Sequence, residues 1–247
     1  DKNLGKVVVT LNPDGTVKEN ISLIDKKSAM TMVEDPDMVK IVKEISANQA
    51  KITETIVGKT DVKLVGDRAV VRTGESNLAD LLTDAMLWKT GADIALTNGG
   101  GIRSSIDVGD ITRGEVIQVL PFGNYVIVQE LTGADVIAAL ENGTAGYPSQ
   151  HGAFSQVAGI KYSFDPSKPV GQRIVSVTMA NGESIDKNKT YKVATNDFIA
   201  AGGDLYVMFK GKKVIGNYEG LDEILTAYIA SGAKAKDGVD GRVKVIN

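Results

Sequence analysis

The segment Leu96-Thr97-Asn98-Gly99-Gly100-Gly101-Ile102-Arg103 ends a short apolar run that begins at Ile94 and is typical of a buried strand. Its three consecutive glycines carry no Cβ atom, so the backbone can turn sharply there and approach another segment closely. Free backbone N–H groups beside the guanidinium of Arg103 suit an anionic, flat ligand. Taken alone, the segment is also typical of a plain turn with a surface arginine, and both interpretations stay open.

The bulk composition is that of an ordinary globular protein. The chain has 247 residues, of which 43% are hydrophobic and 24% charged, and its formal net charge is −3. This length suffices for one large domain, or for one domain and a substantial additional part. The charge does not predict a nucleic-acid-binding surface, so no nucleic-acid polymer is expected as a partner. Apolar runs approaching about 18 residues are absent from the sequence, so we expect no membrane segment in this chain.

Cysteine is absent and histidine occurs once, at His151. Disulfides and thiol chemistry are therefore excluded, while the compartment stays open. Transition-metal centres usually draw on several imidazole or thiolate ligands, so we expect no such centre within this chain. His151 has no partner histidine, and its position in a predicted loop leads us to expect an exposed side chain without a role.

Residues 1–34 are typical of a β-hairpin. Strand-forming runs at 7–11 and 16–23 flank the turn sequence Asn12-Pro13-Asp14-Gly15. A two-stranded hairpin alone is marginal in water. We therefore expect a longer parent protein, in which the hairpin completes a larger sheet that precedes Asp1.

Residues 35–55 predict one long helix. Asp35 is placed as its N-cap, and Pro36 occupies the first helical position. One face is apolar and the other charged, as expected for a connector between two domains. The apolar residues are Met38, Val39, Ile41, Val42, Ile45 and Ile52.

Residues 56–247 mix strands and helices without strict alternation. The predicted strands cover 56–65, 94–96, 125–131, 159–164, 174–179, 191–195 and 242–246. The predicted helices cover 76–88, 112–120, 133–141 and 221–230. This order predicts an α+β fold with a mixed β-sheet and packed helices, preceded by the hairpin and the connector helix.

Two phenylalanines, Phe122 and Phe198, lie in glycine-bounded loops and not in periodic apolar runs. Each ring fits the core beneath its loop. The pair also suits a flat ring held between two aromatic planes, since base–aromatic stacking contributes about 1–3 kcal/mol per base.

Polar residues near the same loops suit the rest of a nucleotide. Arg68, Arg72 and Arg103 are suited to holding a phosphate through charge-assisted hydrogen bonds. Asp204 suits sugar hydroxyls, and a structural role in its Gly-Gly-Asp turn fits equally well.

The segments Thr97–Arg103, Pro121–Asn124 and Asn196–Asp204, taken together and in this order, closely resemble the C-terminal domain of 5′-nucleotidases. That family includes periplasmic UDP-sugar hydrolases, ecto-5′-nucleotidases and 2′,3′-cyclic-nucleotide phosphodiesterases. The resemblance covers residues 56–246. It implies that Phe122 and Phe198 enclose the base, that Asp204 binds the ribose hydroxyls, and that Arg103 contacts phosphate. The further substrate-binding residues that it implies are Arg68, Arg72, Asn98, Gly100, Asn124 and Gly152.

The family's metal domain is not matched, because its Asp-x-His, Gly-Asn-His-Glu and Gly-His-x-His signatures are absent from this sequence. By resemblance, residues 1–34 are a remnant of an N-terminal metallophosphoesterase domain, 35–55 the connecting helix, and 56–247 the nucleotide-binding domain. A divalent metal pair (zinc, manganese or similar) is expected in the N-terminal domain in cis, and no catalytic residue, metal or cofactor in this chain.

The resemblance implies a parent that hydrolyses nucleoside phosphates, in nucleotide catabolism, and is secreted, periplasmic or on the cell surface. Two other interpretations stay open: a non-catalytic nucleoside- or nucleotide-binding module, and an interaction scaffold. In each case, we expect the chain alone to be inactive.

Overall fold

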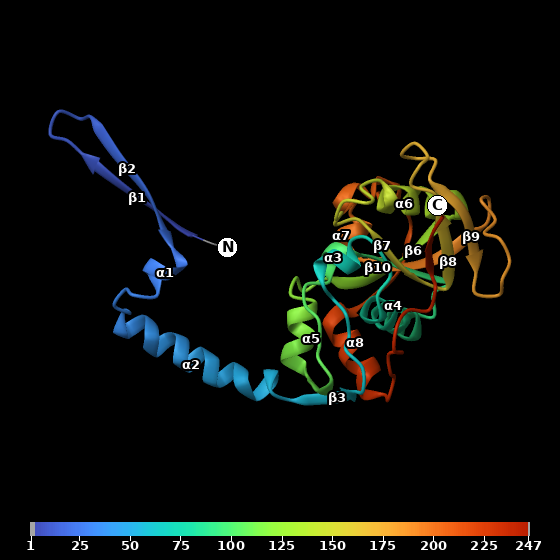
Figure 1. Cartoon of the computed structure of the whole chain (residues 1–247), viewed down its shortest axis with the longest axis horizontal. Helices are drawn as coiled ribbons and strands as arrows, with labels where there is room; N and C mark the ends of the chain where they lie inside the picture. Colours follow the sequence, from blue (N-terminus) through green and yellow to red (C-terminus); the bar gives the residue numbers. More distant parts are fainter. Residues whose placement is uncertain (1–2, 247) are drawn as a thin grey trace. The chain divides into compact units, whose positions relative to one another are not determined.

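The structure is a computed structural model that describes residues 3–246. It consists of two compact units, Asp1–Ala50 and Lys51–Asn247, which are described separately. In the first unit, β1 (Asn3–Leu11) and β2 (Val17–Asp25) pair antiparallel around the predicted turn (Figure 1). The hairpin predicted from the sequence is confirmed.

Helices α1 (Lys26–Ala29) and α2 (Pro36–Thr53) follow the hairpin. The Asp35 carboxylate accepts from the N–H groups of Asp37, at 2.9 Å, and Met38, at 3.1 Å. These two bonds satisfy N–H groups that have no partner within a helix, so the predicted N-cap is confirmed.

A five-stranded mixed sheet forms the centre of the second unit, and it confirms the predicted α+β class. Its order is β11 (Val214–Gly220), β6 (Tyr125–Thr132), β10 (Thr190–Asn196), β4 (Ile94–Asn98) and β7 (Ser155–Ala158). Strands β10 and β4 pair in parallel, and the other neighbours pair antiparallel.

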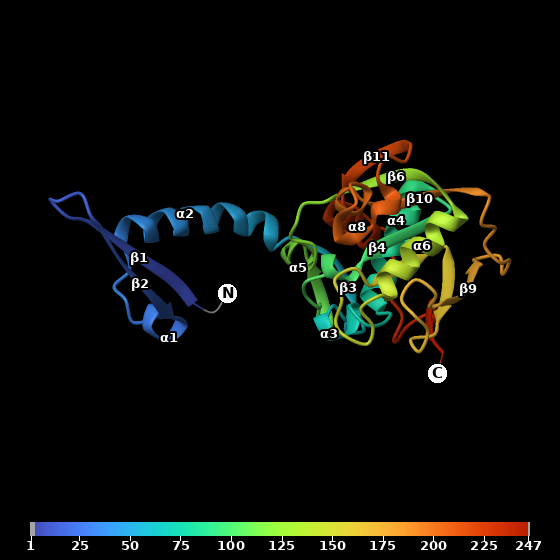
Figure 2. The same ribbon diagram turned by 90° about the horizontal axis from the view of Figure 1, so that it is seen from above.

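Smaller sheets and helices surround this sheet (Figure 2). The smaller sheets are β12 (Val243–Val245)–β8 (Ile160–Phe164)–β9 (Ile174–Met179) and β3 (Ile56–Thr60)–β5 (Gly109–Thr112). The helices are α3 (Arg68–Val71), α4 (Asn77–Thr90), α5 (Arg113–Val119), α6 (Gly133–Thr144), α7 (Asp197–Ala200) and α8 (Leu221–Ala230). The short turns are η1 (Gly99–Gly101), η2 (Gly203–Leu205) and η3 (Val207–Phe209).

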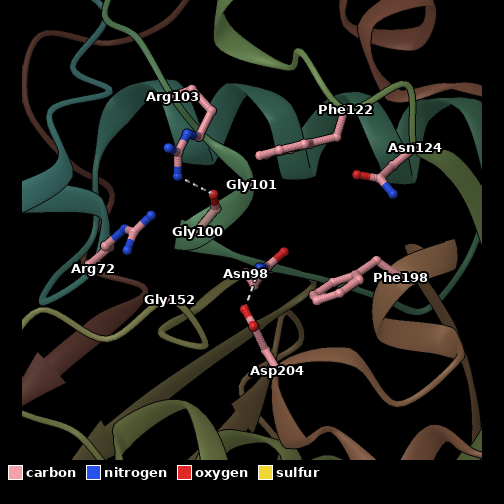
Figure 3. A pocket seen from close by; sticks show the side chains of 10 residues that line it. All are labelled: Arg72, Asn98, Gly100, Gly101, Arg103, Phe122, Asn124, Gly152, Phe198 and Asp204. Atoms are coloured by element: carbon pink, nitrogen blue, oxygen red, sulfur yellow. Dashed lines mark hydrogen bonds between the residues drawn. The ribbon is translucent and has the colours of Figure 1, made fainter. Parts of the chain in front are cut away.

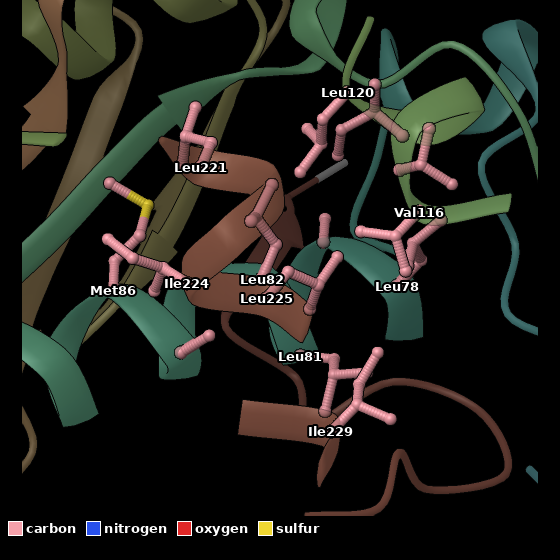
Figure 4. Packing of buried hydrophobic residues seen from close by; sticks show 14 of the residues in the cluster. Leu78, Leu81, Leu82, Met86, Val116, Leu120, Leu221, Ile224, Leu225 and Ile229 are labelled. Carbon is pink, nitrogen blue, oxygen red and sulfur yellow. The ribbon is translucent and has the colours of Figure 1, made fainter. Parts of the chain in front are cut away.

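The two faces of the central sheet bury two separate apolar clusters. Successive side chains of a strand point to opposite faces, so Ile94 and Leu96 of β4 join one cluster and Ala95 joins the other. The Ala95 cluster is completed by α4, α5 and α8, whose packing Figure 4 shows. The opposite cluster contains residues of α6 and β8. Apolar side chains therefore cover both faces of the central sheet.

The C-terminal strand is held to α4 through a buried arginine. Arg242, which is 8% exposed, contacts Asp84 at 2.8 Å, Asp240 at 2.9 Å and Asp80 at 3.4 Å. Burial and the neighbouring Glu75 raise the pKa of Asp80 from 3.8 to about 7, although Arg242 opposes this shift. Between about pH 4 and pH 7, the Asp80 carboxyl is therefore more protonated in the folded chain than in the unfolded chain.

We expect the free energy of unfolding to fall as pH rises from about 4 to 7, because deprotonation of Asp80 is easier in the unfolded chain. Asp80→Asn should flatten this dependence, and Asp107→Asn, at an exposed surface pair, should preserve it. Melting temperatures at pH 5 and pH 8 measure the effect. An Asp80→Asn variant with the same pH dependence as the wild type would contradict the assignment.

Candidate functional site

A cavity of about 350 Å³ opens at the edge of the central sheet where β4 and β10 end and β6 begins. Figure 3 shows the side chains that line it. They are Arg72, Asn98, Gly100, Gly101, Arg103, Phe122, Asn124, Gly152, Phe198 and Asp204. Its volume lies in the range of small-molecule sites.

Nine of the ten residues predicted as substrate-binding line this one cavity, although they come from segments far apart in the chain. The exception is Arg68, an exposed residue whose Nε donates to Gln150 Oε1 at 3.2 Å. Gly101 lines the cavity and was not predicted. The structure brings the nine together; their binding of a nucleotide stays a prediction.

The backbone of the triple-glycine turn, η1, serves the fold. The Gly99 N–H donates to Phe154 O and the Gly100 N–H to Gly152 O, both at 2.8 Å. The N–H groups of Gly99 and Gly100 are therefore engaged within the fold and are not free for an anion. A Cβ on Gly99 would overlap the carbonyl oxygen of Val71 in α3. Glycine is needed here because α3 lies directly against the turn and delivers Arg72, the residue after it, to the cavity.

The cationic side of the cavity consists of side chains. Arg72 is 9% exposed, and its Nε has no hydrogen-bond partner among the described residues. Burial, followed by the charges of Arg68 and Arg103, lowers the pKa of Arg72, and Asp204 partly offsets this. The three arginines place positive charges close together, and Asp204 is the carboxylate that offsets them at Arg72. A bound anion would therefore reduce the repulsion between the arginines.

Phe122 and Phe198 both line the cavity, and 60% and 45% of their respective surfaces are exposed. The interpretation that the ring fills the core beneath its loop is therefore wrong for both residues. The Arg103 guanidinium lies 5.6 Å from the centre of the Phe122 ring. The backbone of Gly203 packs against the Phe198 ring so closely that a Cβ there would overlap it. Both rings are thus supported on one side.

Hydrogen bonds join the two phenylalanine loops. Asn124 Nδ2 donates to Asp197 Oδ1 at 2.7 Å, and the Phe198 N–H donates to the same oxygen at 2.9 Å. Asp197 therefore fixes the separation of the loops that carry the rings.

Asp204 has a left-handed backbone conformation, with φ 49° and ψ 34°. A non-glycine residue in this region is uncommon and persists where its surroundings hold it. Asn142 Nδ2, from α6, donates to its carbonyl oxygen at 3.0 Å, and Asn98 Nδ2 donates to its Oδ2 at 2.8 Å. The role of Asn142 was not predicted, because no sequence pattern connects it with a residue 62 positions away.

His151 is half-buried, and its Nδ1 lies buried without a partner among the described residues. Its ring lies so close to Gly146 that a Cβ there would overlap it. The expectation of an exposed side chain is therefore wrong, because the chain folds back between α6 and β7.

The described residues, 3–246, contain no group of three or more His, Cys, Asp or Glu side chains arranged to hold a metal ion. The residues present therefore do not fit a catalytic metal pair. Among the same residues, no helix is long and apolar enough to cross a membrane.

Comparison with known proteins decides the family. The model of the 5′-nucleotidase C-terminal domain matches residues 56–211, which include every residue that lines the cavity. The chain belongs to the 5′-nucleotidase C-terminal domain family. The resemblance stated from the three sequence motifs is confirmed.

The relatives extend beyond this chain. It is 40% identical over 258 residues to the trifunctional nucleotide phosphoesterase protein YfkN of Bacillus subtilis, covering 98% of this chain and 17% of the relative. It is 34% identical over 219 residues to the UshA protein of Escherichia coli, covering 86% of this chain and 38% of the relative. The crystal structure of a 5′-nucleotidase precursor from Thermus thermophilus superposes with a TM-score of 0.80 at 37% identity, covering 100% of this chain and 50% of that one. The chain therefore spans half or less of these proteins.

Proposed function

We propose that this chain is the nucleotide-binding part of a metal-dependent 5′-nucleotidase or related nucleotide phosphoesterase. The observation that carries the proposal is the pair of exposed rings, Phe122 and Phe198, at a cavity of about 350 Å³. Large apolar side chains that are exposed together at a cavity are typical of a ligand-binding site, where the ligand covers them on binding. A nucleobase is flat and stacks on aromatic rings.

The polar groups extend the proposal to sugar and phosphate. The Asp204 carboxylate and the Asn98 amide lie 2.8 Å apart at the cavity and suit ribose hydroxyls. Arg72 and Arg103 suit the phosphate because a guanidinium pairs with two of its oxygens. Asn124, Gly100 and Gly152 complete the wall around the ligand. Arg68 has an indirect role in this proposal: its positive charge lowers the pKa of the neighbouring Arg72.

Hydrolysis is assigned to a part of the parent protein outside this chain. We propose that residues 1–34 belong to an N-terminal metallophosphoesterase domain, that 35–55 connect it, and that 56–247 bind substrate. The metal pair belongs to that domain, and the residues here supply substrate orientation. The names of the relatives, among them a nucleotide phosphoesterase and a 5′-nucleotidase precursor, support this division. We also propose that the parent protein is exported, so that it is secreted, periplasmic or on the cell surface.

Substitution of Arg72 tests the phosphate-binding part of the proposed site. We expect AMP to bind more tightly than adenosine, and Arg72→Gln to remove most of that difference, since a hydrogen bond to a charged group contributes about 1.5–3 kcal/mol. Arg113→Gln, in α5 and outside the cavity lining, is the control and should retain the preference. Calorimetric titration measures both ligands. An Arg72→Gln variant that still prefers AMP by the wild-type factor would remove Arg72 from the phosphate site.

Catalysis by the chain itself has a separate test. We expect no release of phosphate from AMP with added Mn²⁺ or Zn²⁺, because the described residues offer no metal-ligand cluster. Turnover that stays with the chain through further purification would contradict the division of labour. The non-catalytic binding module remains the alternative, and metal-ligand motifs in the parent sequence before residue 1 would decide against it.

A further inference from the structure

A buried asparagine, Asn196, links the helix that carries Phe198 to the carboxylate of Asp204. Asn196 is 2% exposed and does not line the main cavity. Its Oδ1 accepts from the Ile199 N–H at 2.8 Å and thereby caps α7. Its Nδ2 donates to Asn98 Oδ1 at 3.2 Å and to Thr97 Oγ1 at 3.0 Å. The side-chain amide of Asn196 thus makes three hydrogen bonds, with Ile199, Asn98 and Thr97.

These bonds have a fixed direction. A backbone N–H only donates, so the Ile199 N–H requires Asn196 to present its oxygen to α7 and its NH₂ to Asn98. Asn98 must then present its oxygen to Asn196, which leaves its own NH₂ for Asp204 Oδ2 at 2.8 Å. The orientation of the Asn98 amide at the cavity is therefore set by Asn196 behind it.

We infer that Asn196 is a positioning residue for the ribose-binding side of the site. It keeps the NH₂ of Asn98 directed at Asp204, so that the carboxylate is held in one orientation with its other oxygen available to a sugar hydroxyl. The same side chain places the base-stacking ring, because it caps the helix that bears Phe198. Base and sugar recognition are thereby coupled through one amide. This inference rests on the proposed nucleotide site.

Substitution of Asn196 separates its two functions. Serine and aspartate both keep an acceptor for the helix cap, but neither replaces the donating NH₂ group: ionised aspartate has no donor, and serine has a single, shorter-reaching hydroxyl in place of the separate oxygen and nitrogen of the amide. Asn196→Ser and Asn196→Asp are each expected to weaken adenosine binding by about 3- to 10-fold, the equivalent of one hydrogen bond. Asn188→Ser, at an exposed position, is the matched control and should leave affinity unchanged.

A double-mutant cycle distinguishes positioning from general stability. If Asn196 acts through Asp204, then Asn196→Ser should weaken adenosine binding by less than about 2-fold in an Asp204→Ala background, because the carboxylate it orients is gone. The full single-variant loss in that background would overturn the inference. Wild-type affinity in both single Asn196 variants would overturn it as well.

A measurement without ligand keeps this inference apart from the proposed function. In ¹H–¹⁵N spectra of the wild-type chain, the side-chain NH₂ of Asn98, assigned by its loss in Asn98→Asp, should exchange with solvent far more slowly than that of Asn188. Exchange as fast as that of Asn188 would overturn the link to Asp204, whether or not the variants fold. If adenosine fails to bind and the Asn98 signal is protected, the proposed function fails and the positioning link stands.

Discussion

Gly99→Ala is expected to lower the melting temperature of the second unit more than any other single-methyl addition in the triple-glycine turn. The added Cβ would overlap the Val71 carbonyl oxygen, a backbone atom that moves only if α3 moves. Overpacking of this kind costs about 1–3 kcal/mol or more. Because 1 kcal/mol shifts the melting temperature of a domain of this size by about 2–4 °C, we expect a decrease of about 2–12 °C.

The same substitution tests the link between fold and site. Displacement of α3 also displaces Arg72, so AMP binding should weaken along with stability. Gly74→Ala is the matched control, because its Cβ would lie 3.9 Å from the Val70 carbonyl oxygen, an ordinary contact. Equal melting temperatures for Gly99→Ala and Gly74→Ala would show that the turn tolerates a side chain.

Phe198→Ala and Phe122→Ala are expected to weaken adenosine binding by about 5- to 150-fold each, since each ring contributes the stacking energy of one base–aromatic contact. Both side chains are exposed in the unliganded chain, at 45% and 60%, so their removal should leave the melting temperature close to that of the wild type. Titration calorimetry and thermal unfolding measure the two properties on the same samples.

Trp88→Ala provides the control for loss of an exposed aromatic ring. Trp88 is 50% exposed on α4 and does not line the cavity. Its removal should leave adenosine affinity unchanged. If Phe198→Ala binds adenosine as the wild type does, the base does not stack on that ring, and the arrangement proposed here is wrong at its centre.

Much of the fold could be predicted because local signals were strong. The helix predicted over 112–120 forms as α5, and Thr112 and Glu115 cap its start reciprocally with bonds of 2.8 and 3.2 Å. The predicted strand 125–131 and helix 133–141 match β6 and α6 to within a few residues. Strand β7 was not predicted, because its polar residues Ser155 and Gln156 interrupt the apolar pattern while lying fully buried beside β4.

Most residues that line the cavity could be named from the sequence because loop glycines and aromatics stand out from periodic runs, and because three motifs in order resemble one family. What holds those residues could not be predicted. Asn142 and Asp204 are separated by 62 positions, and Asn98 and Asn196 by 98. Such bonds depend on how the strands are ordered in the sheet, which the local sequence does not encode. For the same reason, the sequence did not show that the Gly99 and Gly100 N–H groups of the glycine turn are engaged by Phe154 and Gly152.

The most direct test of the proposed nucleotide site is a calorimetric titration of the 247-residue chain with adenosine up to millimolar concentration, beside the Phe122→Ala/Phe198→Ala double variant. We predict saturable binding to the wild type and none to the double variant, with both proteins folded by circular dichroism. Absence of binding to the folded wild type, or equal binding to both proteins, would contradict the account.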